Sequence, residues 1–239
     1  ISGNISNWKH PWDIEKLKYT AWKLDDLLGD ASCDIVSDAP LHAATPHSMK
    51  ISINNVYTDG FIKLINEGYW GVPVRKNEKY NLRFFLRASQ DYKGGVVARI
   101  VSSDNKVLAE KRFNVECKEG WNEYVGVLRA KDTDFKGSFE LCFDAPGTVW
   151  VDYVSLFPEK TFNCRENGLR ADVAQKLADL KPAFIRWPGG CIVEGATIEN
   201  RVKWKETLGD PMTRKGEWDL WNYRTTMGFG YHEFLQYCE

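Results

Sequence analysis

The sequence lacks an excess of charge of either sign, and it lacks any long apolar segment. Lys and Arg together number 32 against 33 Asp and Glu, so the formal net charge is −1. This balance excludes a nucleic acid or an anionic membrane held by bulk charge. No apolar run approaches the ~20 residues that a membrane-spanning helix needs. We therefore expect no nucleic-acid partner and no membrane partner.

Metal-binding and cofactor motifs are also absent. The four His residues show no His-x-His or His-x-x-x-His spacing, and the six Cys residues form no Cys-x-x-Cys pair. Neither a Ser-His-Asp pattern nor a phosphate-binding Walker motif is present. The Cys spacing also lacks the density of a disulfide scaffold. We expect no metal site, no bound cofactor and mostly buried thiols, with Cys191 as the exception.

The composition is that of a folded chain with an unusual load of aromatic residues. The 239 residues are 43% hydrophobic and 13% aromatic, and 10 of them are Trp. This length fits one large domain or two ordinary ones. Exposed Trp often marks a sugar-binding surface, and the alternative is a place in the core. Because the chain begins at Ile1 without Met, we expect it to be processed, trimmed or cut from something longer.

Residues 49–157 read as a series of short strands. In most of them apolar and polar residues alternate, which is the pattern of a half-buried strand. Residues 148–156 instead form a run rich in β-branched and aromatic residues. The predicted strands cover residues 80–86, 96–101, 107–115, 138–143 and 148–156. Turn signals such as Lys93-Gly94-Gly95 separate them. We predict a mainly β fold, with a jelly-roll β-sandwich over residues 1–157.

The periodicity changes after residue 158. Apolar residues recur at helical spacing over 169–180, and Pro182 ends that pattern. Residues 183–187 read as a short buried strand, and 231–239 as the start of a further helix. Strand, loop and helix in this order are typical of a (β/α)8 TIM barrel. Residues 158–239 number only 82 against ~250 for a complete barrel, so we predict an incomplete barrel segment.

One motif in this segment is specific. Residues 184–195 read Phe-Ile-Arg-Trp-Pro-Gly-Gly-Cys-Ile-Val-Glu-Gly. This stretch resembles the signature of the family 51 α-L-arabinofuranosidases, and residues 200–209, 218–223 and 228–235 resemble the next stretches of that family in the same order. The part before residue 158 is similar to the carbohydrate-binding-module-like sandwich that some members insert after the first barrel strand. The resemblance makes 183–187 the second barrel strand.

The resemblance implies a function and leaves alternatives open. It implies the N-terminal part of a retaining enzyme that releases terminal arabinofuranose from arabinan or arabinoxylan, as polysaccharide or oligosaccharide. A non-catalytic carbohydrate-binding or scaffold module is the alternative, and a different barrel glycosidase with the same turn is a third. The partners implied are the sugar, the rest of the barrel and a second copy of the chain. A polysaccharide substrate favours a secreted or periplasmic protein, while unpaired Cys residues favour the opposite.

The resemblance also implies roles for particular residues. Arg186 would support the nucleophile carboxylate, since a fixed guanidinium keeps a carboxylate ionised and oriented. Gly190 and Cys191 would contact the sugar, and Glu194 and Trp221 could line the site. The alternatives are a structural ion pair for Arg186, a tight turn for Gly190 and a small buried side chain for Cys191. Trp204 and Trp218 are further candidates for aromatic walls.

The resemblance places both catalytic carboxylates outside this chain. Retaining hydrolysis needs two of them ~5–5.5 Å apart, and in such barrels they follow the fourth and seventh strands. We therefore do not assign that role to Glu194, Glu206 or Glu233. Glu233 is expected on the solvated face of its helix.

Sugar binding by the sandwich would need exposed aromatic residues. The candidates are Tyr57, Trp70, Tyr92 and Trp121. Trp70 lies between glycines and is expected in the core. Asp152 is a candidate ligand of a structural calcium ion, and a purely structural role is the favoured interpretation.

Overall fold

The protein, as a computed structural model, is described for residues 2–3, 22–116, 119–221 and 224–239. These residues form two compact units. The first unit holds 22–41 and 46–158 together with 2–3, and the second holds 42–45 and 159–239. Within these ranges no helix has the length and apolar character needed to cross a membrane.

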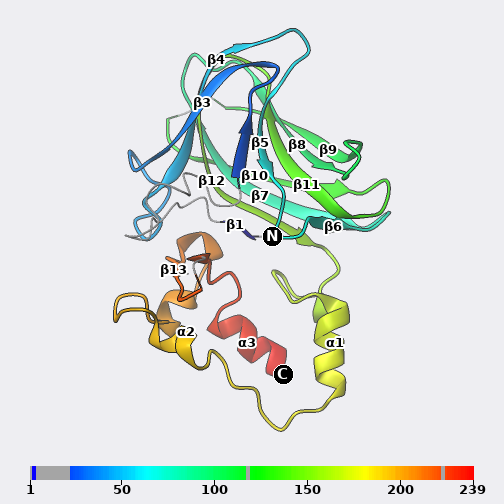
Figure 1. The fold of residues 1–239 in the computed structure, drawn as a ribbon, viewed down its shortest axis with the longest axis vertical. Helices are drawn as coiled ribbons and strands as arrows, with labels where there is room; N and C mark the ends of the chain where they lie inside the picture. Colours follow the sequence, from blue (N-terminus) through cyan, green and yellow to red (C-terminus); the bar gives the residue numbers. More distant parts are fainter. Residues whose placement is uncertain (1, 4–21, 117–118, 222–223) are drawn as a thin grey trace. The chain divides into compact units, whose positions relative to one another are not determined.

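Two antiparallel sheets make up the first unit (Figure 1). One has the strand order β10-β7-β12-β4-β3, with β1 paired to β12, and the other has the order β2-β5-β11-β8-β9, with β6 paired to β11. The strands are β1 (Ser2–Gly3), β2 (Trp22–Asp25), β3 (Gly29–Val36), β4 (Ser48–Val56), β5 (Ile62–Asn66), β6 (Val72–Val74), β7 (Lys79–Ala88), β8 (Gly95–Val101), β9 (Val107–Asn114), β10 (Asn122–Arg129), β11 (Asp134–Phe143) and β12 (Gly147–Pro158). The predicted mainly β sandwich is confirmed, although the strands predicted by range correspond only to β7, β8, β9, β11 and β12.

The core lies between the two sheets, and the two-residue period of the strands explains it. In β7, Leu82, Phe84 and Leu86 are buried in the core, while Arg83 and Arg87 point to the opposite face. Every strand that alternates in this way contributes one apolar face. The two inner faces therefore bury a continuous cluster of large side chains, which is what stabilises a sandwich.

The second unit is built from short elements joined by long turns. They are the 3₁₀ helices η1 (Phe162–Cys164), η2 (Trp204–Thr207) and η3 (Pro211–Thr213), the helices α1 (Ala171–Asp179), α2 (Cys191–Glu194) and α3 (Tyr231–Cys238), and the paired strands β13 (Glu217–Trp218) and β14 (Arg224–Thr225). The helices predicted over 169–180 and 231–239 are confirmed as α1 and α3.

The strand predicted over residues 183–187 is wrong for this structure. These residues carry no strand, and the side chain of Phe184 is 81% exposed. A parallel strand buried on both faces needs hydrogen-bonding neighbours on both sides. The described part of the chain supplies none beside this segment, so its backbone has no ladder to join and Ala183, Phe184 and Ile185 stay exposed.

Candidate functional site

The predicted site begins at a tight turn that leads into α2. The Trp187–Pro188 peptide bond is cis, and Gly190 precedes α2 with φ +56° and ψ −145°. L side chains rarely adopt this conformation, so the turn requires glycine at 190. A Cβ atom added at Gly189 would lie 2.9 Å from Nε of Arg186. The absence of a side chain at Gly189 therefore leaves room for the Arg186 side chain to lie against the turn.

Four of the five predicted site residues are brought together by this turn. Arg186, Gly190, Cys191 and Glu194 all lie within nine residues of chain, and all four are exposed. Among the residues described, none forms a hydrogen bond or ion pair with the Arg186 guanidinium. Arg186 therefore presents an available cation beside the start of α2.

Stacked rings tie the turn to α3. Trp187 stacks on Phe234 with ring centroids 4.1 Å apart, and it also lies 6.3 Å from the ring of Tyr231. Phe229 meets Phe234 edge-on at 4.6 Å. Trp204 lies 5.1 Å from Tyr231, so this candidate for a sugar wall packs against α3 on one side. The aromatic contacts hold the Arg186 turn in place relative to the last helix.

The fifth predicted residue, Trp221, follows strand β13. It is half exposed, and its backbone N–H donates to Oδ1 of Asp219 over 2.8 Å. The side chain of Trp218 lies outside the part of the chain that is described. The structure therefore places Trp221 on a different segment from the Arg186 turn.

A small pocket lies between α2 and the β13–β14 pair. It is lined by Ile192, Gly195, Asn200, Val202, Glu217, Asp219, Leu220, Thr225 and Met227. None of the five predicted residues lines this pocket, although Cys191, Glu194 and Trp221 are each adjacent in the chain to a residue that does. Glu217 and Asp219 are buried carboxylates that the sequence analysis missed. Glu217 forms an ion pair with Lys215 at 3.1 Å. Oδ1 of Asp219 accepts the hydrogen bond from the backbone N–H of Trp221.

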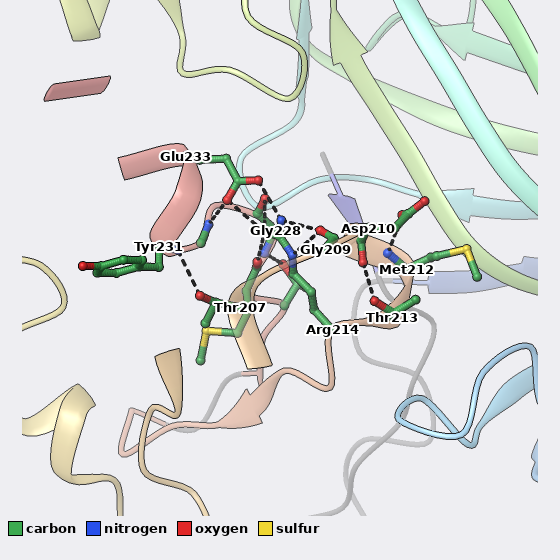
Figure 2. Close-up of polar contacts among 12 residues, drawn as sticks. Thr207, Gly209, Asp210, Met212, Thr213, Arg214, Gly228, Tyr231 and Glu233 are labelled. Carbon is green, nitrogen blue, oxygen red and sulfur yellow. Dashed lines mark hydrogen bonds and ion pairs between the residues drawn. The ribbon is translucent and has the colours of Figure 1, made fainter. Parts of the chain in front are cut away.

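A buried ion pair in this unit joins Arg214 and Glu233 (Figure 2). Their side chains are 2% and 11% exposed, and two parallel hydrogen bonds of 2.7 and 3.1 Å join them. The guanidinium also donates to the carbonyls of Gly209, Met227 and Gly228. This pair anchors α3 to the end of η3.

The pair corrects the expected place of Glu233 on a solvated face. Burial alone would raise the pKa of Glu233, but hydrogen bonds from Arg214 and from the Gly230 N–H outweigh it and hold the pKa below its usual range. A sequence signal for this role exists: Gly230 and Glu233 have the spacing of a capping box, in which the third helical residue accepts from the N-cap backbone.

The aromatic candidates in the sandwich occupy very different environments. Tyr57 is half exposed, and Tyr92 is fully buried with its hydroxyl donating to the Gly95 carbonyl at 2.6 Å. Trp121 donates from Nε1 to the carbonyl of Ala39 at 2.9 Å. Trp70 is 84% exposed, so its expected place in the core is wrong.

Asp152 does not have the surroundings of a calcium ligand. It is fully buried, and Oδ1 accepts from the Tyr153 N–H at 2.6 Å while Oδ2 has no hydrogen-bond partner. No group of three or more His, Cys, Asp and Glu side chains in the described ranges could hold a metal ion. Burial raises the pKa of Asp152 to about 7. A single protonatable carboxyl does not fit a calcium site, which needs several charged oxygen ligands.

The expectation of mostly buried thiols is wrong. Cys33 and Cys142 are buried in the sandwich, whereas Cys164, Cys191 and Cys238 are exposed. Cys117 lies outside the described residues. Burial raises the pKa of the Cys142 thiol to about 12.

Comparison with known proteins gives a consistent set of relatives. A family model described as the alpha-L-arabinofuranosidase 1 domain matches residues 176–239. Alpha-L-arabinofuranosidase A of Aspergillus kawachii is 35% identical over 227 residues, which are 92% of this chain and 35% of the relative. Alpha-L-arabinofuranosidase 1 of Arabidopsis thaliana is 35% identical over 183 residues, 75% of this chain and 26% of the relative.

A solved structure agrees with these matches. The arabinose-bound MgGH51 α-L-arabinofuranosidase superposes with a TM-score of 0.84 and 29% identity, covering 98% of this chain and 38% of the other. The chain thus spans about a third of the length of the curated relatives and of the solved structure that it matches.

Proposed function

Since this chain belongs with the family 51 α-L-arabinofuranosidases, we propose that it is the N-terminal part of an enzyme that releases terminal arabinofuranose from plant polysaccharides or oligosaccharides. One observation carries the proposal: identity of 35% continues through 92% of the chain and so includes the sandwich as well as the Arg186 turn. Arabinan and arabinoxylan are the substrates that we assign to the whole enzyme, and we place it outside the cytoplasm, where these polymers are found.

The catalytic carboxylates of this reaction lie, in our proposal, outside residues 1–239. Retaining hydrolysis requires a nucleophile and an acid/base ~5–5.5 Å apart. The environments of the Glu side chains described in the second unit support this placement. Glu233 is committed to the buried Arg214, and Glu206 is exposed and pairs with Lys203 at 3.8 Å. Glu194 is exposed on α2, in a position to line the site.

This chain contributes to the reaction one cationic side chain and several residues that line the sugar-binding site. The available guanidinium of Arg186 would bind the nucleophile carboxylate, keep it ionised and fix its orientation. Gly190 lets the backbone approach the sugar closely, and Cys191 offers a small exposed side chain directly beside it. Trp221 would cover the leaving-group side with its exposed indole. None of these steps asks Cys191 to act as a nucleophile.

Exposed apolar surface on the second unit supports a larger barrel as the partner of this segment. Leu180, Phe184 and Ile198 are each at least 70% exposed, and Leu177 of α1 is nearly half exposed. Large apolar side chains left in solvent in such number are typical of a surface that another part of a structure covers. The remaining strands and helices of the barrel are the partner that we propose.

Hydrolysis of 4-nitrophenyl α-L-arabinofuranoside tests the proposal, with this chain measured beside a longer protein that contains the complete barrel. We expect activity in the longer protein alone, and we expect Arg186→Ala to lower its kcat by roughly 10²- to 10³-fold, the cost of losing one charge-stabilising group. The control is Arg170→Ala, which removes an exposed Arg paired with Asp172 and should leave kcat unchanged. Activity in this chain alone would contradict the placement of the carboxylates, and silence in both would contradict the function.

A further inference from the structure

A five-residue excursion separates two strands that pair with the same strand, β11, in the second sheet of the sandwich. Strands β5 and β6 both pair with β11, β5 along Phe139–Phe143 and β6 at Asp134 and Gly137 (Figure 1). Between them, residues 67–71 leave the line of the sheet. If β5 continued directly into β6, residues 67–71 would not have to leave the sheet. These five residues therefore serve a purpose other than strand pairing.

The excursion carries two aromatic side chains into solvent. Tyr69 is 88% exposed and Trp70 is 84% exposed. Their ring centroids lie 4.9 Å apart at an interplanar angle of 65°, so the two rings form the walls of an open corner. Phe135 of β11 is also more than half exposed. Single exposed apolar residues need no explanation, but two exposed aromatic rings in contact with each other mark a candidate binding surface.

The backbone holds this corner rigidly. The buried side chain of Asn66 accepts the Gly68 N–H at 2.9 Å, which fixes the start of the turn. Gly71 has φ +99°, and a Cβ atom there would lie 2.4 Å from Cα of Lys136. The end of the turn is therefore packed directly on the backbone of β11. A surface fixed before its ligand arrives loses little entropy on binding.

The polar groups around the corner fit a ligand rich in hydroxyl groups. Glu67 and Lys136 are both exposed, and the exposed Arg75 lies over the Phe135 ring at 5.9 Å, so the surroundings offer a carboxylate acceptor and cationic donors. Sugar rings present weakly positive C–H groups to the electron-rich face of an aromatic ring, and their hydroxyls bond to such flanking groups. A stable protein partner would instead cover about 800 Å² on each side, far more than two rings beside Phe135 offer.

We propose that Tyr69 and Trp70 form a sugar-binding platform on the sandwich, separate from the Arg186 turn, which takes one ring of a neutral polysaccharide. The identity of that polysaccharide rests on the function proposed above. The platform keeps the polymer attached to the protein while terminal residues are removed elsewhere.

Binding of soluble arabinoxylan to the 239-residue chain, measured by isothermal titration calorimetry, tests the platform. We expect Trp70→Ala to raise Kd about tenfold, the loss expected when roughly 60 Å² of apolar surface is no longer covered. Tyr69→Ala should weaken binding in the same direction. The matched control is Leu27→Ala, which removes an apolar side chain of the sandwich that is 83% exposed and should change Kd less than twofold.

Several results would overturn the platform. Wild-type affinity in Trp70→Ala would do so, as would the absence of arabinoxylan binding by the wild-type chain. Self-association of the wild type that Trp70→Ala abolishes would show that the rings contact a second copy instead. Far-UV circular dichroism of each variant confirms that the sandwich is folded.

The two proposals fail in distinguishable ways. The longer protein with Trp70→Ala should hydrolyse 4-nitrophenyl α-L-arabinofuranoside at the wild-type rate, because Trp70 belongs to the sandwich. If that small substrate is hydrolysed while the variant keeps full arabinoxylan affinity, the proposed function stands and the platform is rejected. If the small substrate is not hydrolysed at all, the proposed function fails, and arabinoxylan binding is judged by itself.

Discussion

At the scale of single residues, burial decides what a side chain does, and Asp152 shows this most directly. Its carboxyl group is fully buried on β12 and bonded only to the N–H of Tyr153. Removing it from water raises its pKa to about 7, far above the ~3.9 of an exposed aspartate. The folded sandwich therefore holds a proton that the unfolded chain releases.

This proton makes the stability of the sandwich depend on pH. The stabilisation is complete below pH ~4, and it is lost as the pH rises to about 7, because the folded state binds more protons in that window. Relative to Asp152→Asn, which does not titrate, the wild type should lose roughly 2–4 kcal/mol of unfolding free energy between pH 4 and pH 7. Urea denaturation at several pH values measures the difference, and parallel curves for the two proteins would contradict it.

The residue scale is also where sequence reasoning fails. Two glycines around Trp70 suggest a packed position, but they serve a turn that projects the ring into solvent. Helical spacing places Glu233 in solvent, but Arg214, 19 residues earlier, covers it. Both errors have one cause, since the environment of a side chain depends on segments that local patterns do not describe.

At the scale of elements, local sequence pattern predicts a helix or strand correctly where the backbone hydrogen-bond partners of that element lie within the same unit. The strands β7, β11 and β12 follow from alternation because each has hydrogen-bonding neighbours within the sandwich. The helices α1 and α3 form their hydrogen bonds internally. The predicted strand at 183–187 differs, because a strand is defined by its neighbours and this one has none among the described residues.

The position of α3 depends on one ion pair, and this can be tested against an exposed pair of the same length. Arg214→Met leaves Glu233 with a buried, uncompensated charge, which typically costs 3–5 kcal/mol. Hydrogen exchange should show the amides of α3 losing most of their protection. Arg170→Met removes a surface pair with Asp172, also 2.7 Å long, and should cost at most about 1 kcal/mol. Equal effects of the two changes would show that burial does not set the strength of the contact.

At the scale of the whole molecule, the two units differ in how their apolar residues are used. The sandwich buries a continuous core, whereas Ala174 is the one fully buried hydrophobic residue in the described part of 159–239. The motifs in the sequence point to an enzyme family, and the comparisons confirm that resemblance. What no local pattern could supply is the surface that we propose covers the second unit.

Limited proteolysis of the 239-residue chain should reveal this difference. We expect cuts to accumulate first within 159–239, because few buried contacts oppose local opening there, and a fragment that contains 22–158 should persist. Mass spectrometry of the time course identifies the cut sites. Preferential cleavage inside the sandwich would contradict the prediction, and the same digestion of a longer protein should protect 159–239.

The excursion at residues 67–71 has one more effect, which concerns solubility. It shortens the free edge beside β11 to the three residues of β6, and the middle one is Pro73, which has no N–H to donate. Open sheet edges are templates on which further chains can add strands and grow into aggregates. The segment that displays two aromatic rings to solvent therefore also leaves an edge too short, and too poor in donors, for another chain to extend.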